Sequence, residues 1–166
     1  IGAGASGLSA ALTSAKSGAK IILADEDFLM GGRLNNETNK IDGVLGSKWG
    51  ANIVAKLSEM QNVTLMADTT IFGVYDHGIY GALENKSSEA RENNDKPRQV
   101  NWRIYAKRAI LCTGAIERAI AFGNNDRPGI MMASAVRTYV NRFAVTPGQN
   151  ITVFTNNDDG WQTARD

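Results

Sequence analysis

The sequence predicts an α/β fold with a parallel sheet, and three observations support this prediction. Gly2, Gly4 and Gly7 are spaced as G-x-G-x-x-G at the very start of the sequence. An alanine-rich stretch with helical spacing follows, and an apolar run at 21–23 then ends at Asp25. A glycine turn, a helix, a strand and an acidic residue in this order are typical of the unit that opens a Rossmann-like dinucleotide-binding domain.

Each part of this fingerprint has a physical role. Gly2 permits a tight turn, Gly4 lets the backbone approach a pyrophosphate, and Gly7 lets the helix pack closely on the strand. The free N–H groups and the positive end of the helix dipole then face the phosphates. A carboxylate at Asp25 accepts hydrogen bonds from ribose hydroxyls and disfavours an added 2′-phosphate, so NAD or the ADP half of FAD fits better than NADP. The alternative is a glycine turn used for packing alone.

The other elements follow along the chain. Apolar spacing predicts helices at 5–17, 47–60 and 131–143, and another from Trp161 onward. Short apolar runs predict strands at 20–25, 63–66, 109–112 and 151–154, of which 20–25 and 109–112 are expected to be buried. Alternating patterns predict an antiparallel β-meander with strands at 69–75, 79–83 and 100–105 and a turn at 76–78. We interpret 26–39 as a loop and the polar segment 85–98 as a solvated hairpin tip.

These elements predict two parts of the chain. A Rossmann-like FAD/NAD(P)-binding domain is expected over 1–149, with the β-meander inserted at about 69–106. The start of a second Rossmann-like subdomain is expected over 150–166. Because only the last residue of the first strand is present, we expect the sequence to be a segment of a longer protein.

Composition narrows the possible partners. The chain has 18 basic and 17 acidic residues, so its net charge of +1 gives no reason to expect nucleic acid as a partner. Its apolar runs are far shorter than the ~20 residues of a membrane helix. A single cysteine, Cys112, excludes an internal disulfide and favours a reducing compartment such as the cytoplasm. With His77 as the only histidine, a zinc site of the Cys/His kind is excluded, and we predict neither a metal site nor a catalytic residue.

Four further motifs narrow the family. Gly31-Gly32-Arg33 follows the fingerprint, and Arg33 is expected to reach a phosphate or to hold its loop in place. Residues 108–115, RAILCTGA, are similar to the apolar strand ending in Ala-Thr-Gly with which two-dinucleotide flavoproteins close over their dinucleotide. Residues 124–131, NNDRPGIM, and 156–161, NNDDGW, resemble the α-subunit family of heterotetrameric sarcosine oxidases. That family also includes the α-type subunits of proline dehydrogenase complexes and opine oxidases.

The resemblance, carried over position by position, implies a set of cofactor-binding residues. It implies that the pyrophosphate touches Gly2, Gly4, Ala5, Ser6 and Gly7. It implies that Asp25 holds the ribose with Glu26 nearby, and that Gly32 and Arg33 lie under the diphosphate. It further implies that the backbone at Thr70 and Ile71 contacts adenine, and that Thr113 and Gly114 close the site.

The resemblance also implies the activity. The expected protein is the α subunit of a hetero-oligomeric oxidase that oxidises a small secondary N-methyl amine with oxygen, giving aldehyde, glycine and peroxide. In this view the segment binds NAD mainly as a structural element. Two alternatives stay open, an FAD-binding subunit of an amino-acid or opine dehydrogenase and a non-catalytic, nucleotide-stabilised docking module.

At the second fingerprint position, 155–160, two carboxylates replace glycines, so like-charge repulsion predicts that no second pyrophosphate binds there.

Overall fold

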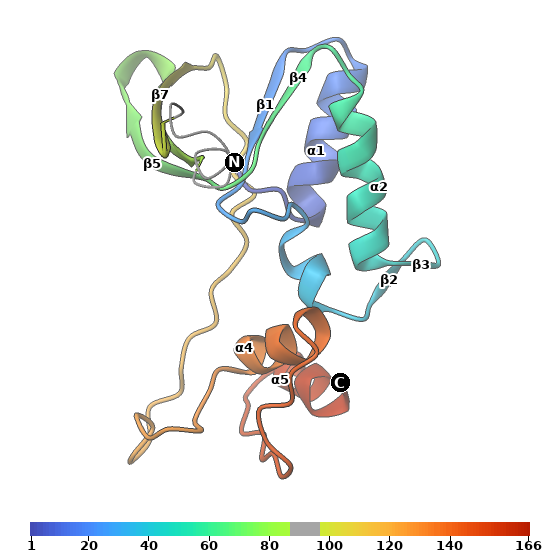
Figure 1. Ribbon diagram of the computed structural model, residues 1–166, viewed down its shortest axis with the longest axis vertical. Coiled ribbons are helices and arrows are strands. Elements are labelled where there is room, and N and C mark those ends of the chain that lie inside the picture. Colours follow the sequence, from blue (N-terminus) through green and yellow to red (C-terminus); the bar gives the residue numbers. More distant parts are fainter. Residues whose placement is uncertain (87–96) are drawn as a thin grey trace. The chain divides into compact units, whose positions relative to one another are not determined.

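The computed structural model describes residues 1–86 and 97–166, which form two compact units. The first unit contains Ile1–Gly32 and Gly50–Gly114, and the second contains Arg33–Trp49 and Ala115–Asp166. Helix α2 begins in the second unit and ends in the first. Figure 1 shows the elements of both units coloured along the sequence.

A parallel pair of strands forms the centre of the first unit. β1 (Ile21–Ala24) pairs with β4 (Val63–Met66), and Ile21 lies opposite Val63. Helix α1 (Ala5–Lys16) packs on β1, as Figure 1 shows, and α2 (Gly46–Ser58) provides the crossover to β4. A parallel pair of strands joined through a helix is the arrangement that the sequence predicts, so the α/β fold with a parallel sheet is confirmed.

The core of the first unit consists of small and aliphatic side chains. In α1 the buried residues recur every three or four positions, because a helix with that spacing presents one apolar face to the sheet. The buried apolar side chains of α1, β1, α2 and β4 are Leu8, Ala11, Ala15, Leu23, Ala24, Ile53, Leu57 and Met66. This packing fixes the start of α1 against the ends of the parallel strands.

An antiparallel meander completes the first unit. β5 (Thr69–Tyr75), β6 (Ile79–Asn85) and β7 (Gln99–Tyr105) pair in that order. The predicted turn at Asp76–Gly78 is a short 3-10 segment, and His77 adopts a left-handed φ of 62° within it. Most of the segment that we interpret as a hairpin tip, 85–98, is residues 87–96, which lie outside the described residues.

The prediction of a buried strand at 109–112 is wrong in part. Ile110 and Leu111 are exposed, and no strand is formed there. The segment nevertheless makes two strand-like hydrogen bonds, from the Ile1 amino group to the Ile110 carbonyl oxygen (2.8 Å) and from the Cys112 N–H to the Ile1 carbonyl oxygen (2.7 Å). Cys112 is half-buried rather than buried.

The second unit consists mainly of short helices. The 3-10 helix η1 (Gly32–Asn36) lies within the predicted loop and leads to a small hairpin of β2 (Lys40–Ile41) and β3 (Val44–Leu45). Asp42 and Gly43 between these strands both have positive φ, 51° and 79°, which is the hairpin turn that an Asp-Gly pair favours. The sequence reasoning missed this hairpin because its strands are only two residues long.

Two predictions for the second unit need correction. The helix predicted at 131–143 is α4 (Ala133–Arg137) followed by the π-helical η3 (Thr138–Arg142), and its buried residue is Arg137, while Tyr139 and Phe143 are exposed. An ion-pair network around Arg137 takes the place of the predicted apolar face. Residues 151–154 form no strand, because they have no strand partner among the described residues.

The final helix is present and begins earlier than the sequence predicts. α5 (Asp158–Arg165) starts three residues before Trp161. Asn157 caps its first turn, accepting hydrogen bonds from the N–H groups of Asp159 and Gly160 at 3.0 and 3.3 Å. This cap sets the start of the helix.

Candidate functional site

The glycine fingerprint forms a closely packed turn. Gly2 has φ of 93°, and a Cβ there would lie 2.3 Å from the carbonyl oxygen of Cys112. At Gly7 a Cβ would lie 1.8 Å from the carbonyl oxygen of Gly2. Real Cβ contacts are never this short, so any side chain at either position would force the turn and the helix apart. These two glycines therefore have the packing roles that the fingerprint predicts.

The amino end of α1 is open. Gly4 is its N-cap, and a Cβ there would meet no described atom within 4 Å. Among the described residues no side chain caps this helix, and its first turn contains no acidic residue. The N–H groups of its first turn, which includes Ala5 and Ser6, lack partners within the helix, and the helix dipole makes the same place positive. The geometry therefore fits an anion such as a pyrophosphate.

Asp25 follows β1 and supports the fingerprint turn. One carboxylate oxygen accepts a hydrogen bond from the N–H of Ala3, and the other accepts one from the N–H of Asp27 at 2.9 Å. A carboxylate has about four lone-pair positions, so both oxygens retain capacity for a ligand hydroxyl. Sequence reasoning assigned Asp25 to the ribose alone and missed its contact with the glycine turn.

The start of β5 lies next to Asp25. The N–H of Thr69, a residue only 1% exposed, donates to the carbonyl oxygen of Asp25 at 2.8 Å. Thr70 and Ile71 follow directly, the first exposed and the second half-buried. Glu26 is also exposed. The structure thus brings the predicted ribose and adenine residues into one region of the first unit.

Gly32 and Thr113 also lie next to the fingerprint glycines. Gly32 has φ of 54°, and a Cβ there would lie 3.0 Å from the Cα of Gly4, so the glycine pair approaches the open helix end closely. The backbone N of Thr113 would lie 3.2 Å from a Cβ at Gly2. Gly114 follows Thr113 with φ of 72°, and both residues are exposed.

Arg33 belongs to the second unit, where carboxylates surround its guanidinium group. Its Nε lies 2.8 Å from Oε1 of Glu37, and its Nη2 donates to Oδ1 of Asp159. Burial alone would lower the pKa of Arg33, but the hydrogen bond to Asp159 and the charge of Glu37 outweigh this effect and raise it. Of the two roles predicted for Arg33, the structure shows the contacts that hold its loop.

The amino end of α5 differs from that of α1. The Asn157 side chain already accepts hydrogen bonds from its first N–H groups, and the first turn contains Asp158 and Asp159. Both features disfavour the binding of an anion, because the N–H donors already have an acceptor and the local charge is negative. The amino ends of α1 and α5 therefore have opposite electrostatic character.

The described residues contain no group of three or more His, Cys, Asp or Glu side chains placed to hold a metal ion.

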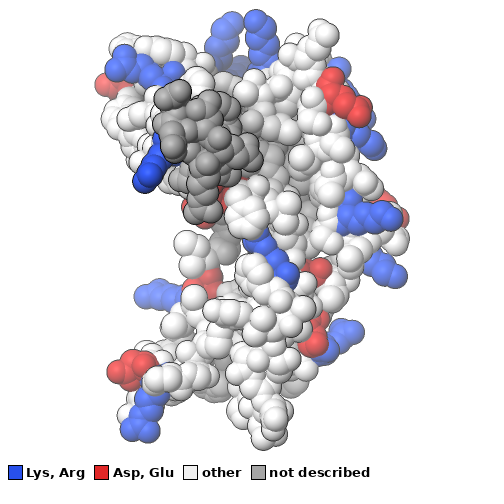
Figure 2. Space-filling model, in the orientation of Figure 1, with Lys and Arg blue, Asp and Glu red and all other residues white. Residues whose placement is uncertain are grey.

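In Figure 2 the basic side chains occupy several separate places on the face shown, with acidic side chains among them. No helix within 1–86 or 97–166 has both the length and the apolar character needed to cross a bilayer. Sequence reasoning also missed Glu37 and Arg137, and for Arg137 the signal was a basic residue between the apolar positions of the predicted helix.

Comparison with known proteins agrees with this geometry. The family of NAD(P)-binding Rossmann-like domains matches residues 1–70, which contain the fingerprint, Asp25 and the glycine pair. The Rossmann-like fold predicted from the fingerprint is therefore confirmed, and a dinucleotide is the cofactor class that it supports.

Curated relatives match over the whole chain. The α subunit of sarcosine oxidase from Rhizobium meliloti (strain 1021) is 45% identical over 167 aligned residues, covering 100% of this chain and 17% of that protein. The α subunits of sarcosine oxidase from Corynebacterium sp. strains U-96 and P-1 are 39% and 38% identical, covering 95% and 100% of this chain and 17% and 18% of those proteins. The chain thus spans less than a fifth of the length of these relatives.

A solved structure shows the same architecture. L-Proline dehydrogenase from P. horikoshii superposes with a TM-score of 0.69 at 26% identity, over 90% of this chain and 28% of that one. The resemblance drawn from the fingerprint and the two asparagine-rich motifs is thereby confirmed. Along its whole length the chain is homologous to the α subunits of sarcosine oxidases, and its amino-terminal part is a Rossmann-like dinucleotide-binding domain.

Proposed function

We propose that this chain is the dinucleotide-binding part of the α subunit of a sarcosine oxidase-type complex. The complex would oxidise the N-methyl group of sarcosine with oxygen and hydrolyse the product with water, giving glycine, formaldehyde and hydrogen peroxide. The observation that supports the proposal most directly is the open amino end of α1, in a chain 45% identical to such a subunit. A helix start without a side-chain cap or acidic residue is suited to hold a pyrophosphate.

In this proposal the chain binds NAD through one continuous surface of the first unit. The backbone N–H groups from Gly4 to Gly7 hold the pyrophosphate, and the carboxylate of Asp25 accepts the ribose hydroxyls with Glu26 beside it. The closeness of Thr69 to Asp25 supports an adenine position against Thr70 and Ile71. Gly32 lies under the diphosphate, and Thr113 with Gly114 closes the site.

The carboxylates at the ribose favour NAD over NADP, because a 2′-phosphate would be repelled there. NAD supplies hydride chemistry in many enzymes, but we propose that here it serves mainly as a structural element. FAD is the alternative occupant of the same site, because its ADP half makes the same contacts. We infer that α5 binds no second pyrophosphate, and the Asn157 cap with its two neighbouring acids supports this.

The names of the relatives as subunits support a hetero-oligomeric complex for this chain. We propose that other subunits carry the amine-oxidising site, so that the small amine substrate binds to the complex. The single cysteine supports a reducing compartment, and the cytoplasm is the location that we propose.

Cofactor extraction tests the proposal. The full-length chain, purified within its complex and then separated, is expected to be colourless and to release NAD on denaturation, as identified by mass. A yellow chain that releases FAD would place the flavin in this site instead. A full-length chain that carries neither nucleotide and binds neither would contradict the proposed function.

A substitution of Asp25 by alanine tests where the ribose lies. Loss of the charged acceptor is expected to weaken NAD binding by about 1–3 kcal/mol. Titration calorimetry on the complex measures this change, with Asp76→Ala, an exposed carboxylate in the β5–β6 turn, as the matched control. Unchanged affinity in the Asp25 variant would show that the ribose lies elsewhere.

A further inference from the structure

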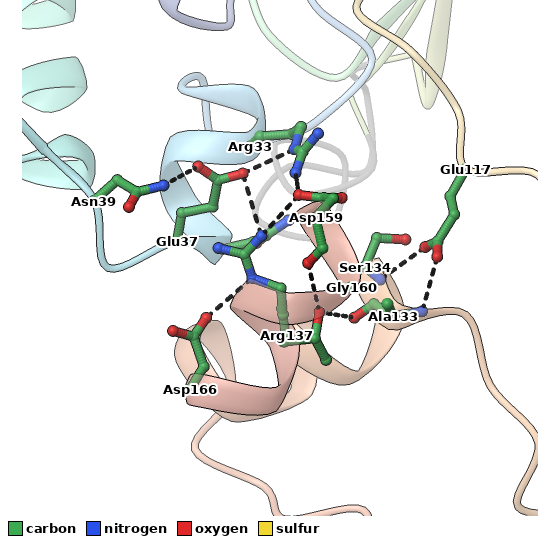
Figure 3. A network of polar contacts seen from close by, with 12 residues as sticks. Arg33, Glu37, Asn39, Glu117, Ala133, Ser134, Arg137, Asp159, Gly160 and Asp166 are labelled. Atoms are coloured by element: carbon green, nitrogen blue, oxygen red, sulfur yellow. Dashed lines mark hydrogen bonds and ion pairs between the residues drawn. The ribbon is translucent and has the colours of Figure 1, made fainter. Parts of the chain in front are cut away.

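Each unit buries a charged side chain that the proposed function does not use. In the second unit, the Arg137 side chain is 3% exposed, with Nη1 3.1 Å from Oδ1 of Asp159 and Nε 2.9 Å from Oδ2 of Asp166. Figure 3 shows Arg137 among the acidic side chains of that unit. These contacts join elements of the second unit to one another, so they account for the packing of that unit alone. The first unit buries Glu84, on the meander that carries the proposed adenine position.

Glu84 is a carboxylate of β6 with a partner for each of its oxygens. The residue is 8% exposed. Its Oε1 lies 2.8 Å from Nζ of Lys86, and its Oε2 accepts a hydrogen bond from Nε1 of Trp102 at 2.8 Å. Trp102 is on β7, diagonal to Glu84 across the sheet, where a long side chain reaches its neighbour. The carboxylate therefore ties β6 to β7 on one face of the meander.

Glu84 lies where the meander joins the parallel strands. It is directly opposite Thr69, the first residue of β5, so the two side chains share one face of the sheet. The N–H of the next residue, Asn85, donates to the carbonyl oxygen of Asp68 at 2.9 Å. Asp68 has a left-handed φ of 49°, which persists only where the surrounding contacts hold it. The buried carboxylate is thus next to the turn from which β5 starts.

The same turn is bonded to the proposed ribose residue. The N–H of Thr69 donates to the carbonyl oxygen of Asp25 at 2.8 Å, and the N–H of Asp68 donates to that of Asp27 at 3.0 Å. The Thr69 N–H therefore points away from β6, along the free edge of β5, the outer strand of the described sheet. Because paired and unpaired positions alternate along an antiparallel ladder, the N–H and C=O of Ile71 point to the same edge. This edge offers one donor and one acceptor on the side of Asp25.

A carboxylate that served only the stability of the sheet could be replaced by an apolar side chain at little cost, since well-packed apolar groups often stabilise as much as a buried ion pair. We propose that Glu84 is a positioning residue for the adenine end of the nucleotide site. By fixing β6 opposite Thr69, it keeps the edge of Ile71 facing the base whose ribose is held by Asp25. This inference rests on the proposed function of the fingerprint.

The base itself provides a probe of this edge. Adenine presents an acceptor at N1 and a donor at its 6-amino group, which match a backbone N–H and C=O at fixed positions. Hypoxanthine reverses both groups, with a donor at N1 and an acceptor at O6. Nicotinamide hypoxanthine dinucleotide therefore keeps the pyrophosphate and both riboses of NAD and changes only the part that β5 would contact.

The experiment uses the full-length chain in its complex after removal of nucleotide. Glu84→Met removes the carboxylate, Glu84→Gln keeps an acceptor for Trp102, and Glu59→Met is the matched control, an exposed carboxylate of the same unit. Trp102→Phe is the second route, because it removes the indole N–H and keeps an aromatic ring. Titration calorimetry gives the dissociation constants of NAD and of the hypoxanthine dinucleotide, and thermal unfolding without nucleotide gives the stability of each variant.

The unaltered chain is expected to bind NAD more tightly than the hypoxanthine dinucleotide. Glu84→Met is expected to weaken NAD binding about three- to tenfold, the effect of one neutral hydrogen bond, and to leave the analogue nearly unchanged. The ratio of the two dissociation constants then moves toward one. Glu84→Gln should restore part of the original ratio, and Glu59→Met should not change it.

An unchanged ratio in a folded Glu84→Met chain, whatever its stability, would overturn the inference, because a purely structural role affects both dinucleotides equally. If Glu84→Met does not fold, the same comparison in Trp102→Phe decides, and a loss of the preference for adenine there supports the inference. An unaltered chain that binds both dinucleotides equally would overturn the inference while leaving the proposed function intact. An unaltered chain that does not bind NAD would overturn both.

Discussion

Replacement of Gly4 by alanine is expected to weaken nucleotide binding without changing the stability of the fold. The φ and ψ of Gly4, −71° and −171°, lie in the extended region that any residue adopts. A Cβ at this position meets no described atom within 4 Å. We therefore expect the free energy of unfolding without nucleotide to change by less than about 0.5 kcal/mol, as for other substitutions without packing consequences.

The same methyl group would stand where the pyrophosphate approaches the helix. A hydrogen bond between a backbone N–H and a charged oxygen contributes about 1.5–3 kcal/mol. Loss of one such bond corresponds to about a 10- to 150-fold weaker affinity. The dissociation constant of NAD is therefore expected to rise by about that factor while stability stays the same.

Titration calorimetry on the complex, together with chemical unfolding of each variant, measures both quantities. Gly123→Ala is the matched control, because a Cβ there also meets nothing within 4 Å and the residue lies outside the fingerprint. Two results would refute the reasoning. Unchanged NAD affinity in Gly4→Ala would mean that the phosphates do not approach this residue, and a large loss of stability would mean that the turn is packed differently.

Three other predictions test the surrounding geometry. Gly7→Ala places a methyl group 1.8 Å from the carbonyl oxygen of Gly2, so the midpoint of chemical unfolding should fall by the equivalent of about 1–3 kcal/mol even without nucleotide. Asn157→Ala removes the cap of α5 and should cost about 1 kcal/mol in the same assay without creating a second NAD site in calorimetry. Because the folded chain lowers the pKa of Asp166, the stability this carboxylate contributes is present above the ordinary aspartate value of about 3.9 and is lost as the pH falls through the lower folded value. Acid unfolding should therefore become less steep below about pH 4 in Asp166→Asn, and an unchanged slope would contradict the ion-pair assignment.

The parts of the fold with local signals could be predicted from the sequence. The positions of Leu8, Ala11 and Ala15 define one helical face, and α1 buries that face as predicted. The spacing of the fingerprint glycines likewise predicts their roles, and the contacts of Gly2 and Gly7 agree with this prediction. In these cases the residues that determine the structure are close together in the sequence.

The second unit could not be predicted in the same way. Apolar spacing placed Tyr139 and Phe143 on the buried face, but Arg137 occupies the interior because its ion partners come from distant segments. Arg33 and Asp159 are 126 positions apart, so no local pattern indicates their pairing. The strand expected at 151–154 failed for a related reason, because a strand requires a partner that the local sequence does not reveal.

The sequence predicts which residues form the candidate site better than it predicts the contacts of those residues. The glycines, Asp25 and Thr70 lie together in the first unit, but the hydrogen bond from Ala3 to Asp25 depends on the tertiary arrangement of two segments. The same is true of the acids at 158 and 159. Their charge indicated an unfavourable place for phosphate, while the Asn157 cap that uses the helix donors became visible only in the structure.

The hydrogen bond between Ile1 and Ile110 joins residues 109 positions apart, and Cys112 also donates to Ile1. During synthesis the fingerprint is made before residues 110–113, so the rest of the first unit must be made before the turn at Gly2 has these neighbours. In the proposed function, the nucleotide would therefore bind only after the whole first unit has been made. Bound nucleotide would then indicate that residues from both ends of the first unit are in contact.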